Sequence, residues 1–348
     1  MLARRSAGPA GHRLRVGTVN AAAPLLSVID LEVHYRLPGH RDEVHAVDGV
    51  TFDILPREIF GLIGESGCGK SSVARAVMRL APIAAGTVAL GGIGLETLRG
   101  RELRRQRRRV QMVFQDPHES LDPRLTVRRA VREPLELVGG DTAAGREARV
   151  RELVDRVGLD ESHLDRKPHE LSGGQKQRVN IARALALSPE LLVCDEAVSA
   201  LDVSVRAGII NLLLALQQEL GISVLFISHD IGVVAHVADR IGVMYLGKLV
   251  EVAAAESLTR QPRHPYTEAL LAAEPQARPS TDRVVRAPLI KGDAPSAARP
   301  PSGCRFRTRC RYAVELCAQV EPELRPVADG GMVACHLADT LELTGRRD

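Results

Sequence analysis

Short apolar runs alternate with longer helical patterns through the second half of the chain. The runs LLVCD (191–195) and SVLFIS (223–228) are almost entirely apolar, as strands are when both faces of a sheet are covered. Between them lies VRAGIINLLLALQQEL (205–220), which is long enough for a helix and too long for a typical strand. This alternation predicts a parallel sheet with helices on its faces.

The first third of the chain has strand patterns of two kinds. SVIDLEVH (27–34) and VDGVTFDI (47–54) predict antiparallel strands, and the apolar run IFGLIG (59–64) predicts a buried one. After a glycine-rich turn, SVARAVMRL (72–80) is expected to be helical. The sequence therefore predicts an α/β fold with an additional antiparallel part.

Local composition divides the chain into regions. Residues 25–275 are expected to form the main domain, with a polar, helical part at about 116–187. A Pro-rich linker is expected at 276–301 and a small Cys-rich domain at 302–340. Residues 1–24 lack the apolar stretch of a secretory signal, which indicates a disordered extension or a start codon placed too far upstream.

Charge and hydropathy limit the possible function classes. A net charge of +4 is too small to indicate binding to nucleic acid. No stretch reaches the ~18–20 apolar residues of a membrane span, so a membrane role would need partner proteins. The run RELRRQRRR (101–109) fits either a solvated helix face or a contact with anionic lipid headgroups or a membrane partner.

The segment GESGCGKS (64–71) follows a predicted strand and precedes a predicted helix, which is the setting of a phosphate-binding loop. Its glycines let successive backbone N–H groups turn toward the phosphates. Lys70 would reach the β- and γ-phosphates, and the Ser71 hydroxyl would reach Mg²⁺. The sequence therefore predicts ATP and Mg²⁺ as ligands, and the predicted binding residues are Gly64, Glu65, Ser66, Gly67, Cys68, Gly69, Lys70, Ser71 and Ser72.

Two further motifs narrow this prediction. LLVCDE (191–196) ends a predicted strand in two carboxylates, as expected where acids are delivered to Mg²⁺. LSGGQ (171–175) lies between it and the phosphate loop, and in this order the three motifs resemble an ABC-type ATPase. The resemblance implies an ABC-type P-loop nucleotide-binding domain. Such a domain has a RecA-like core, an antiparallel β subdomain and a helical signature subdomain, here followed by a small Cys-rich C-terminal extension.

The resemblance also implies roles for the residues at the strand ends. Asp195 would hold Mg²⁺ through water, and Glu196 would polarise the attacking water. Gln115 ends the run VQMVFQ and matches the residue that senses Mg²⁺ and the membrane subunit together. The implied Mg²⁺ ligands are Ser71, Gln115 and Asp195.

His229 and Tyr35 have weaker sequence signals. A single histidine is more often structural, but His229 directly follows a predicted strand, where the family has a histidine that contacts the γ-phosphate. Tyr35 matches the aromatic residue that stacks on adenine. A single tyrosine near a strand end also fits ordinary packing.

The LSGGQ motif would act on a second chain. In the family it covers the ATP of a facing subunit, so that ATP lies between two chains and each chain is half of two active sites. The signature residues are Leu171, Ser172, Gly173, Gly174 and Gln175. The adjoining D-loop residues are Ser199, Ala200, Leu201 and Asp202.

Several longer segments are similar to the ATPases of oligopeptide/dipeptide importers, a group that includes nickel importers. They are FQDPHESLDPRLTV (114–127), RKPHELSGGQKQR (166–178), CDEAVSALDVSVRA (194–207), VMYLGKLVE (243–251), RHPYTEALL (263–271) and PPSGCRFRTRCRYAVELC (300–317). Two positions depart from the family pattern, Ala197 for the usual Pro and Ser72 for the usual Thr. We expect activity to survive both changes.

This similarity implies an ATP hydrolase coupled to transport, peripheral on the cytoplasmic face of the plasma membrane. It would bind two membrane permease subunits and a homologous second ATPase subunit, or a second copy of itself. An extracytoplasmic solute-binding protein would deliver substrate through the permeases, and no nucleic acid is involved. The alternative is a soluble ABC ATPase acting on nucleic acid or ribosomes, but the chain lacks the coiled-coil insertion or second cassette typical of those proteins.

Four cysteines lie in the C-terminal region with the spacing C-x5-C-x6-C-x17-C: Cys304, Cys310, Cys317 and Cys335. From spacing alone, free thiols and a metal site both fit. The resemblance favours a [4Fe–4S] cluster, with Zn²⁺ as the alternative. The neighbouring arginines at 305, 307, 309 and 311 are expected to keep the thiols ionised.

Overall fold

The computed structural model of the chain describes residues 23–36, 43–116, 120–274, 290, 292–293, 295–328 and 330–346. The predicted extension at 1–24 and the predicted linker at 276–301 lie largely outside the described residues. Among those residues, no helix is long and apolar enough to cross a bilayer.

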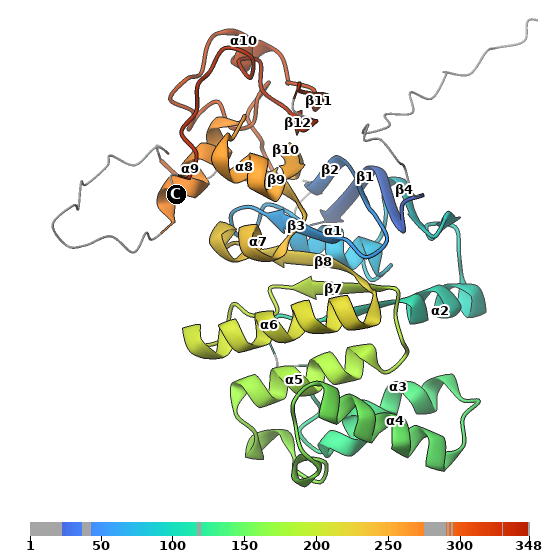
Figure 1. Cartoon of the computed structure of the whole chain (residues 1–348). Helices are drawn as coiled ribbons and strands as arrows, with labels where there is room; N and C mark the ends of the chain where they lie inside the picture. The colour runs from blue at the N-terminus through green and yellow to red at the C-terminus, as the bar shows by residue number, and fades with distance from the viewer. Residues whose placement is uncertain are drawn as a thin grey trace, which may run out of the picture.

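The main sheet has eight strands in the order β11-β12-β10-β9-β3-β8-β7-β6 (Figure 1). Five neighbouring strands, from β9 to β6, are parallel. Their bounds are β3 Ile59–Ile63, β6 Val110–Val113, β7 Leu191–Asp195, β8 Ser223–Ser228 and β9 Arg240–Tyr245, and β10 Lys248–Ala254 returns antiparallel to β9. The wholly apolar runs of the sequence are thus buried strands.

Side chains on the two faces of this sheet enter two separate cores, because alternate residues of a strand point to opposite sides. Ile59 and Ile63 of β3 join one core, together with helices α5, α6 and α7. Phe60 and Leu62 join the other core, between the main sheet, helix α1 and the antiparallel sheet. The bounds are α1 Lys70–Val77, α5 Gly173–Leu185, α6 Val203–Leu220 and α7 Ile231–Val237.

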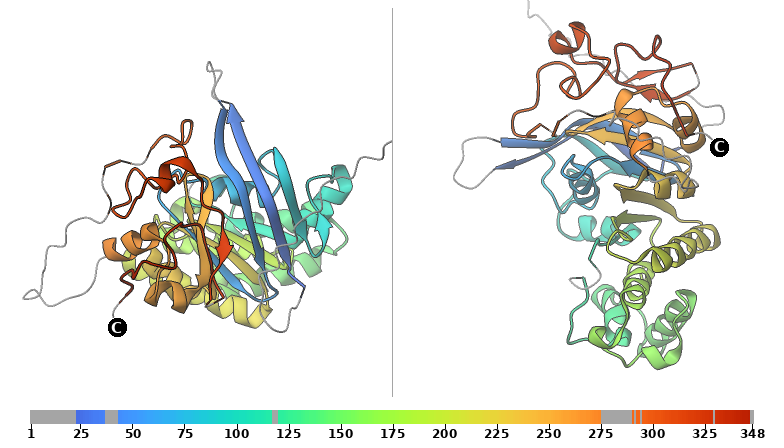
Figure 2. Two further views of the ribbon diagram at one scale, coloured as in Figure 1. Left: turned by 90° about the horizontal axis from the view of Figure 1, so that it is seen from above. Right: turned by 90° about the vertical axis from the view of Figure 1, so that its left-hand side faces the viewer.

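The antiparallel sheet has the order β2-β1-β4-β5 and stands beside the main sheet (Figure 2, left). Its strands are β1 Leu26–Arg36, β2 Glu43–Ile54, β4 Ala85–Leu90 and β5 Ile93–Gly94, and α2 (Gly100–Arg109) leads from it into β6. Helix α1 is shorter than expected. It ends at Val77, and Arg79 has a φ of +55°, in the left-handed region that stops a helix.

The basic run at 101–109 forms α2, and part of it is structural. Arg107 donates to the backbone carbonyls of Met78 and Arg79, and Arg109 pairs with Glu190 at 2.6 Å. The remaining arginines of the run are exposed.

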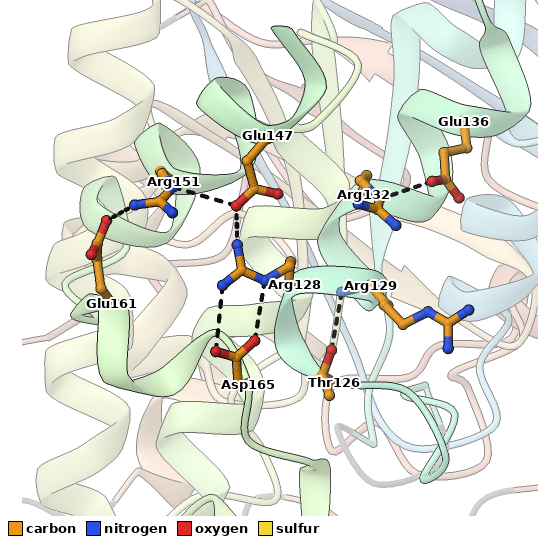
Figure 3. Close-up of polar contacts among 9 residues, drawn as sticks. All are labelled: Thr126, Arg128, Arg129, Arg132, Glu136, Glu147, Arg151, Glu161 and Asp165. Atoms are coloured by element: carbon orange, nitrogen blue, oxygen red, sulfur yellow. Dashed lines mark hydrogen bonds and ion pairs between the residues drawn. The ribbon is translucent and has the colours of Figure 1, made fainter. Parts of the chain in front are cut away.

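A layer of helices lies at the end of the molecule opposite to the C-terminal region (Figures 1 and 2). It contains α3 (Val127–Val138), α4 (Ala143–Arg156) and two short 3₁₀ helices, Glu161–His163 and Pro168–Glu170, and it packs on α5. Arg128 joins its parts by pairing with Glu147 of α4 and with Asp165 (Figure 3). Thr126 caps α3 by accepting from Arg129 N.

The C-terminal region extends the main sheet. After α8 (Ala255–Arg260) and α9 (Pro265–Ala273), the segment from 295 onward contains α10 (Leu316–Gln319), β11 (Arg325–Pro326) and β12 (Met332–Val333). Strand β12 pairs antiparallel with β10. Phe306 of this segment is buried in the core that also holds α5, α6 and α7. The Cys-rich segment is therefore packed onto the main domain.

Candidate functional site

Four parallel strands deliver the predicted phosphate-binding and catalytic residues to one edge of the main sheet. The phosphate loop follows β3, Gln115 follows β6, Asp195 and Glu196 end β7, and His229 follows β8. Because these strands are parallel neighbours, their carboxyl ends meet at the same edge, where ligands bind in open α/β sheets.

The phosphate loop depends on glycine at two positions for close backbone approach. A Cβ on Gly64 would lie 2.1 Å from Met244 O, and one on Gly69 would lie 2.1 Å from Ala46 O. Both residues also have positive φ, at +153° and +109°, a conformation that glycine adopts without steric cost. The loop is thus wrapped tightly around the N-terminus of α1, which points its amides and positive dipole end toward an anion.

Lys70 lies under this loop with its side chain almost fully buried. Its ammonium donates to the backbone carbonyls of Gly64, at 2.8 Å, and Glu65, at 2.9 Å. The charge is therefore held at the centre of the loop, within reach of a bound phosphate.

The Mg²⁺ side of the site is formed by two predicted residues from different elements. Ser71 Oγ donates to Asp195 Oδ1 at 3.0 Å. Burial is the main cause that raises the pKa of Asp195, and the Glu196 carboxylate beside it raises it further. A divalent cation would offset both effects, and a hydroxyl with a carboxylate is the oxygen donor set that Mg²⁺ prefers.

Glu196 is the meeting point of the three predicted catalytic residues. Gln115 Nε2 donates to Glu196 Oε2 at 2.9 Å, and His229 Nδ1 lies 3.7 Å from the same oxygen. The backbone of Glu196 has a φ of +48°, in the left-handed region, and its N–H donates to Ile227 O of β8. Backbone conformations of this uncommon kind cluster at functional sites.

The signature residues begin α5. Ser172 Oγ accepts from Gln175 N, and Gln175 Oε1 accepts from Ser172 N, which is a capping box. A Cβ on Gly174 would lie 2.5 Å from Val205 Cγ1 of α6, so glycine allows the two helices to approach closely. The predicted helix N-terminus is present, and α5 lies on the far side of α6 from α1 (Figure 1).

The predicted D-loop connects the signature helix to Glu196. Ser199 Oγ donates to Glu196 O at 2.9 Å, and Leu201 lies 3.6 Å from the Cβ position of Gly173. Gln177 of α5 donates to Ala197 O at 2.6 Å. Sequence reasoning missed Gln177, because nothing in the local pattern shows which backbone a buried amide will meet.

Comparison with known proteins agrees with this arrangement. Residues 47–199 match the family described as "ABC transporter", and residues 250–317 match "Oligopeptide/dipeptide transporter, C-terminal region". The putative oligopeptide transport ATP-binding protein YkfD of Bacillus subtilis is 49% identical over 90% of this chain and 95% of its own. The oligopeptide transport ATP-binding protein AppF of the same organism is 47% identical over 85% and 90%.

The chain is an ATP-binding subunit of the oligopeptide/dipeptide ABC transporter family. Among solved structures, the dimeric structure of the bacterial ABC transporter cassette MJ0796 is 31% identical, with a TM-score of 0.60 over 66% of this chain and 98% of its own. A second structure of the same cassette, dimeric and bound to ADP and Pi, has the same TM-score. The expected ABC ATPase fold and family are thus confirmed.

The predicted adenine-stacking residue of this ABC ATPase lies on β1. The Tyr35 side chain is half-buried against the core of the antiparallel sheet, and its hydroxyl has no hydrogen-bond partner among the described residues. Its strand pairs with β2 at Val44. The ring is therefore anchored at the end of the strand pair by ordinary packing.

All four C-terminal cysteines line one small pocket, together with His264 and Phe306. The pKa values of Cys304, Cys310 and Cys335 are raised to about 11, mainly by burial and in part by the neighbouring thiols. In the sequence these four cysteines are separated by 5 to 17 residues, and the fold brings them together around one pocket.

The expectation that the four neighbouring arginines keep the thiols ionised is wrong, because the pKa values of Cys304, Cys310 and Cys335 are raised and each arginine bonds another group. Arg305 pairs with Asp48, Arg309 with Glu65 and Arg311 with Glu268, all in the main domain. Arg307 bonds Ser302 within its own segment. Carboxylates and carbonyls outcompete protonated thiols as acceptors for guanidinium groups, so these side chains mainly attach the segment to the cassette.

Proposed function

We propose that this subunit binds Mg²⁺-ATP between its phosphate loop and the signature helix of a facing ATPase chain. ATP hydrolysis would drive the import of peptides through two membrane permeases. The observation that carries the proposal is the meeting of Lys70, Asp195, Glu196 and His229 at one sheet edge, in a chain that also has the oligopeptide/dipeptide C-terminal region.

Mg²⁺ would be held by Ser71, Gln115 and Asp195. The fit rests on the donor set, because Ser71 and Asp195 offer neighbouring oxygens and the buried carboxylate needs a positive partner. The ion supplies neutralisation of the charge on the β- and γ-phosphates. Lys70 would add a second positive charge, exchanging loop carbonyls for phosphate oxygens.

Glu196 would orient the attacking water as the catalytic base. Glu196 has a left-handed backbone directly after the strand, and His229 lies 3.7 Å from its carboxylate, where it would contact the γ-phosphate. The Gln115 amide bonded to Glu196 would hold that carboxylate until partner contact and Mg²⁺ rearrange it. Hydrolysis would thereby depend on the state of the loop after β6.

The facing chain would be a homologous second ATPase or a second copy of this one. The capped N-terminus of α5 would bind the phosphates of the facing chain's ATP, because within this chain α5 lies on the far side of α6 from α1 (Figure 1). The dimeric cassette structures of a relative 31% identical support a two-chain site. The signature and D-loop of one chain would cover the ATP of the other.

The subunit would sit on the cytoplasmic face of the plasma membrane, bound to two permeases. Phe114, directly before Gln115, has 41% of its surface exposed, which suits contact with a membrane subunit. An extracytoplasmic solute-binding protein would supply the peptide. This arrangement requires no membrane span in the described residues.

The C-terminal pocket would hold a [4Fe–4S] cluster through Cys304, Cys310, Cys317 and Cys335. Four sulfur donors around one pocket fit such a group, and its irons would relieve the mutual repulsion of the ionised thiols. Zn²⁺ held by the same four thiolates is the alternative. The cluster would cross-link the C-terminal segment that carries the four cysteines.

The function is tested by reconstitution. The isolated subunit is expected to hydrolyse ATP slowly, and the rate should rise when the permeases and second ATPase are added to vesicles. ATP-dependent uptake of labelled dipeptides is the positive result, with labelled nickel as the alternative cargo. An isolated chain already at the full-complex rate, or one stimulated by nucleic acid or ribosomes instead, would contradict the proposal.

A further inference from the structure

A buried arginine from the Cys-bearing segment reaches the phosphate loop. Arg309 Nη1 lies 2.8 Å from Glu65 Oε2, and the two residues are 244 positions apart in sequence. Only 9% of the Arg309 side chain and 29% of the Glu65 side chain are exposed. A pair with so little solvent around it is screened far less than a surface ion pair.

The arginine is held by an aromatic cluster. Arg309 Nη1 also donates to Tyr245 Oη at 3.3 Å, and its guanidinium lies 5.8 Å from the centre of that ring. The rings of Tyr245 and Tyr266 both pack against Phe306, with centroids 5.2 and 5.3 Å away. Arg309 N donates to Phe306 O, so the aromatic anchor and the arginine belong to one short turn.

The same cluster holds the backbone of the loop. Tyr266 Oη, fully buried in α9, accepts from Glu65 N at 2.8 Å. Glu65 O in turn accepts from the Lys70 ammonium at 2.9 Å. The residue directly after Gly64 is therefore fixed at its side chain, its N–H and its carbonyl.

The ion pair between Arg309 and Glu65 matters for phosphate binding because Glu65 is negatively charged. A carboxylate in a loop that receives the phosphates of ATP repels them, unless a cation neutralises it. The Arg309 guanidinium is the cation that pairs with the Glu65 carboxylate, and this pair is largely shielded from water. Its hydrogen bond also turns Glu65 toward the C-terminal region.

We infer that Arg309 is a positioning residue for the ATP site: it neutralises and holds Glu65, so that the C-terminal region sets the affinity of the phosphate loop for ATP. This inference rests on the proposed function only in requiring that the loop bind ATP. Tyr266 assists by holding the Glu65 backbone. Neither residue touches the reacting atoms.

The test is a double-mutant cycle on the purified full-length chain, with Mg²⁺ and a fluorescent ATP analogue. Arg309→Ala should raise the Kd for the analogue about tenfold, since truncating one member of a buried charge pair leaves the other unpaired. Glu65→Gln should lower the Kd, because it removes the carboxylate that repels the phosphates and leaves the Arg309 charge beside the loop. The double variant Arg309→Ala, Glu65→Gln should return to within about threefold of the Glu65→Gln value, because coupled residues are non-additive.

Two further variants separate neutralisation from a general loss of structure. Arg309→Lys keeps the charge and should retain most of the affinity. Arg307→Ala is the matched control, because Arg307 bonds Ser302 in the same segment and should leave the Kd unchanged. Thermal unfolding of each variant is measured in parallel.

An unchanged Kd in Arg309→Ala overturns the inference. So does a double variant as weak as Arg309→Ala alone, because Arg309 would then act by folding the segment and not through Glu65. Lys70→Ala in the same assay keeps these results apart from the proposed function. If the wild-type chain did not bind the analogue, or Lys70→Ala bound it equally well, the ATP site itself would be wrong.

Discussion

At the scale of single residues, Glu196 is the side chain on which hydrolysis should depend most. Glu196→Gln keeps the shape of the side chain and its contact with Gln115 but removes the base that orients water. We expect ATP binding to persist, and the ATPase rate of the reconstituted complex to fall about 10²- to 10⁴-fold. The measurement is phosphate release beside nucleotide binding, and near-normal turnover would refute the role of Glu196.

Lys70 and Ser172 should separate binding from assembly of the two-chain site. Lys70→Ala removes the buried ammonium, so nucleotide binding to the isolated chain should weaken. Ser172→Arg should spare that binding and block ATPase activity of the complex. Ser172→Ala is the comparison variant: it loses the helix cap, worth about 1 kcal/mol, without adding a bulky charge, so it should reduce ATPase activity less than Ser172→Arg does. If Ser172→Arg lost binding as severely as Lys70→Ala, the signature would act within its own chain.

The residue scale also shows what sequence can and cannot predict. Lys70, Ser71 and Asp195 were predicted because a short motif fixes their chemistry, and the fold brings Ser71 and Asp195 within 3.0 Å. Arg309 was assigned to the thiols because they are its sequence neighbours. Its partner in the fold is Glu65, which is 244 residues away in sequence, so no local sequence pattern predicts this contact.

At the scale of elements, the cap of α9 should make stability depend on pH. His264 Nδ1 accepts from Tyr266 N, and burial lowers the pKa of His264 from 6.5 to about 3. The folded chain therefore keeps this imidazole neutral, whereas the unfolded chain protonates it below about pH 6.5. As pH falls from 6.5 toward 3, this group should reduce the free energy of unfolding by up to about 1.4 kcal/mol per pH unit.

His264→Asn retains a side-chain acceptor for the cap and removes the titration. Urea unfolding at pH 7.0 and 5.5 should show a smaller loss of stability in His264→Asn than in the wild-type chain. Equal losses in the two chains would show that the imidazole does not control this pH dependence. Since α9 carries Tyr266, acid should also loosen the contact with Glu65.

Elements differed in how well the sequence predicted them. Strands β3, β7 and β8 were predicted because their residues are buried on both faces, which leaves continuous apolar runs. Strands β11 and β12 have two residues each and no pattern of their own, so only pairing with β10 defines them. The end of α1 was missed because Arg79 takes a left-handed backbone that its sequence does not favour.

At the scale of the whole molecule, the Cys pocket should decide how firmly the C-terminal region is attached. Anaerobically purified protein is expected to be brown, with iron and sulfide in equal amounts per chain, and Cys310→Ser should lose both. Cys194→Ala is the matched control, because Cys194 is buried in β7, away from the pocket. Stoichiometric zinc without sulfide would indicate a zinc site instead, and protein without metal would leave ordinary thiols.

The pairing of β12 with β10 also affects how the chain would associate with other molecules at high protein concentration. β10 would otherwise be the last strand on its side of the main sheet, and β12 covers it through Glu251 and Val252. An uncovered strand offers free N–H and C=O groups that recruit strands of other molecules. The C-terminal region thus also protects the cassette from edge-to-edge aggregation, so a truncated cassette would tend to precipitate even with every ATP-site residue intact.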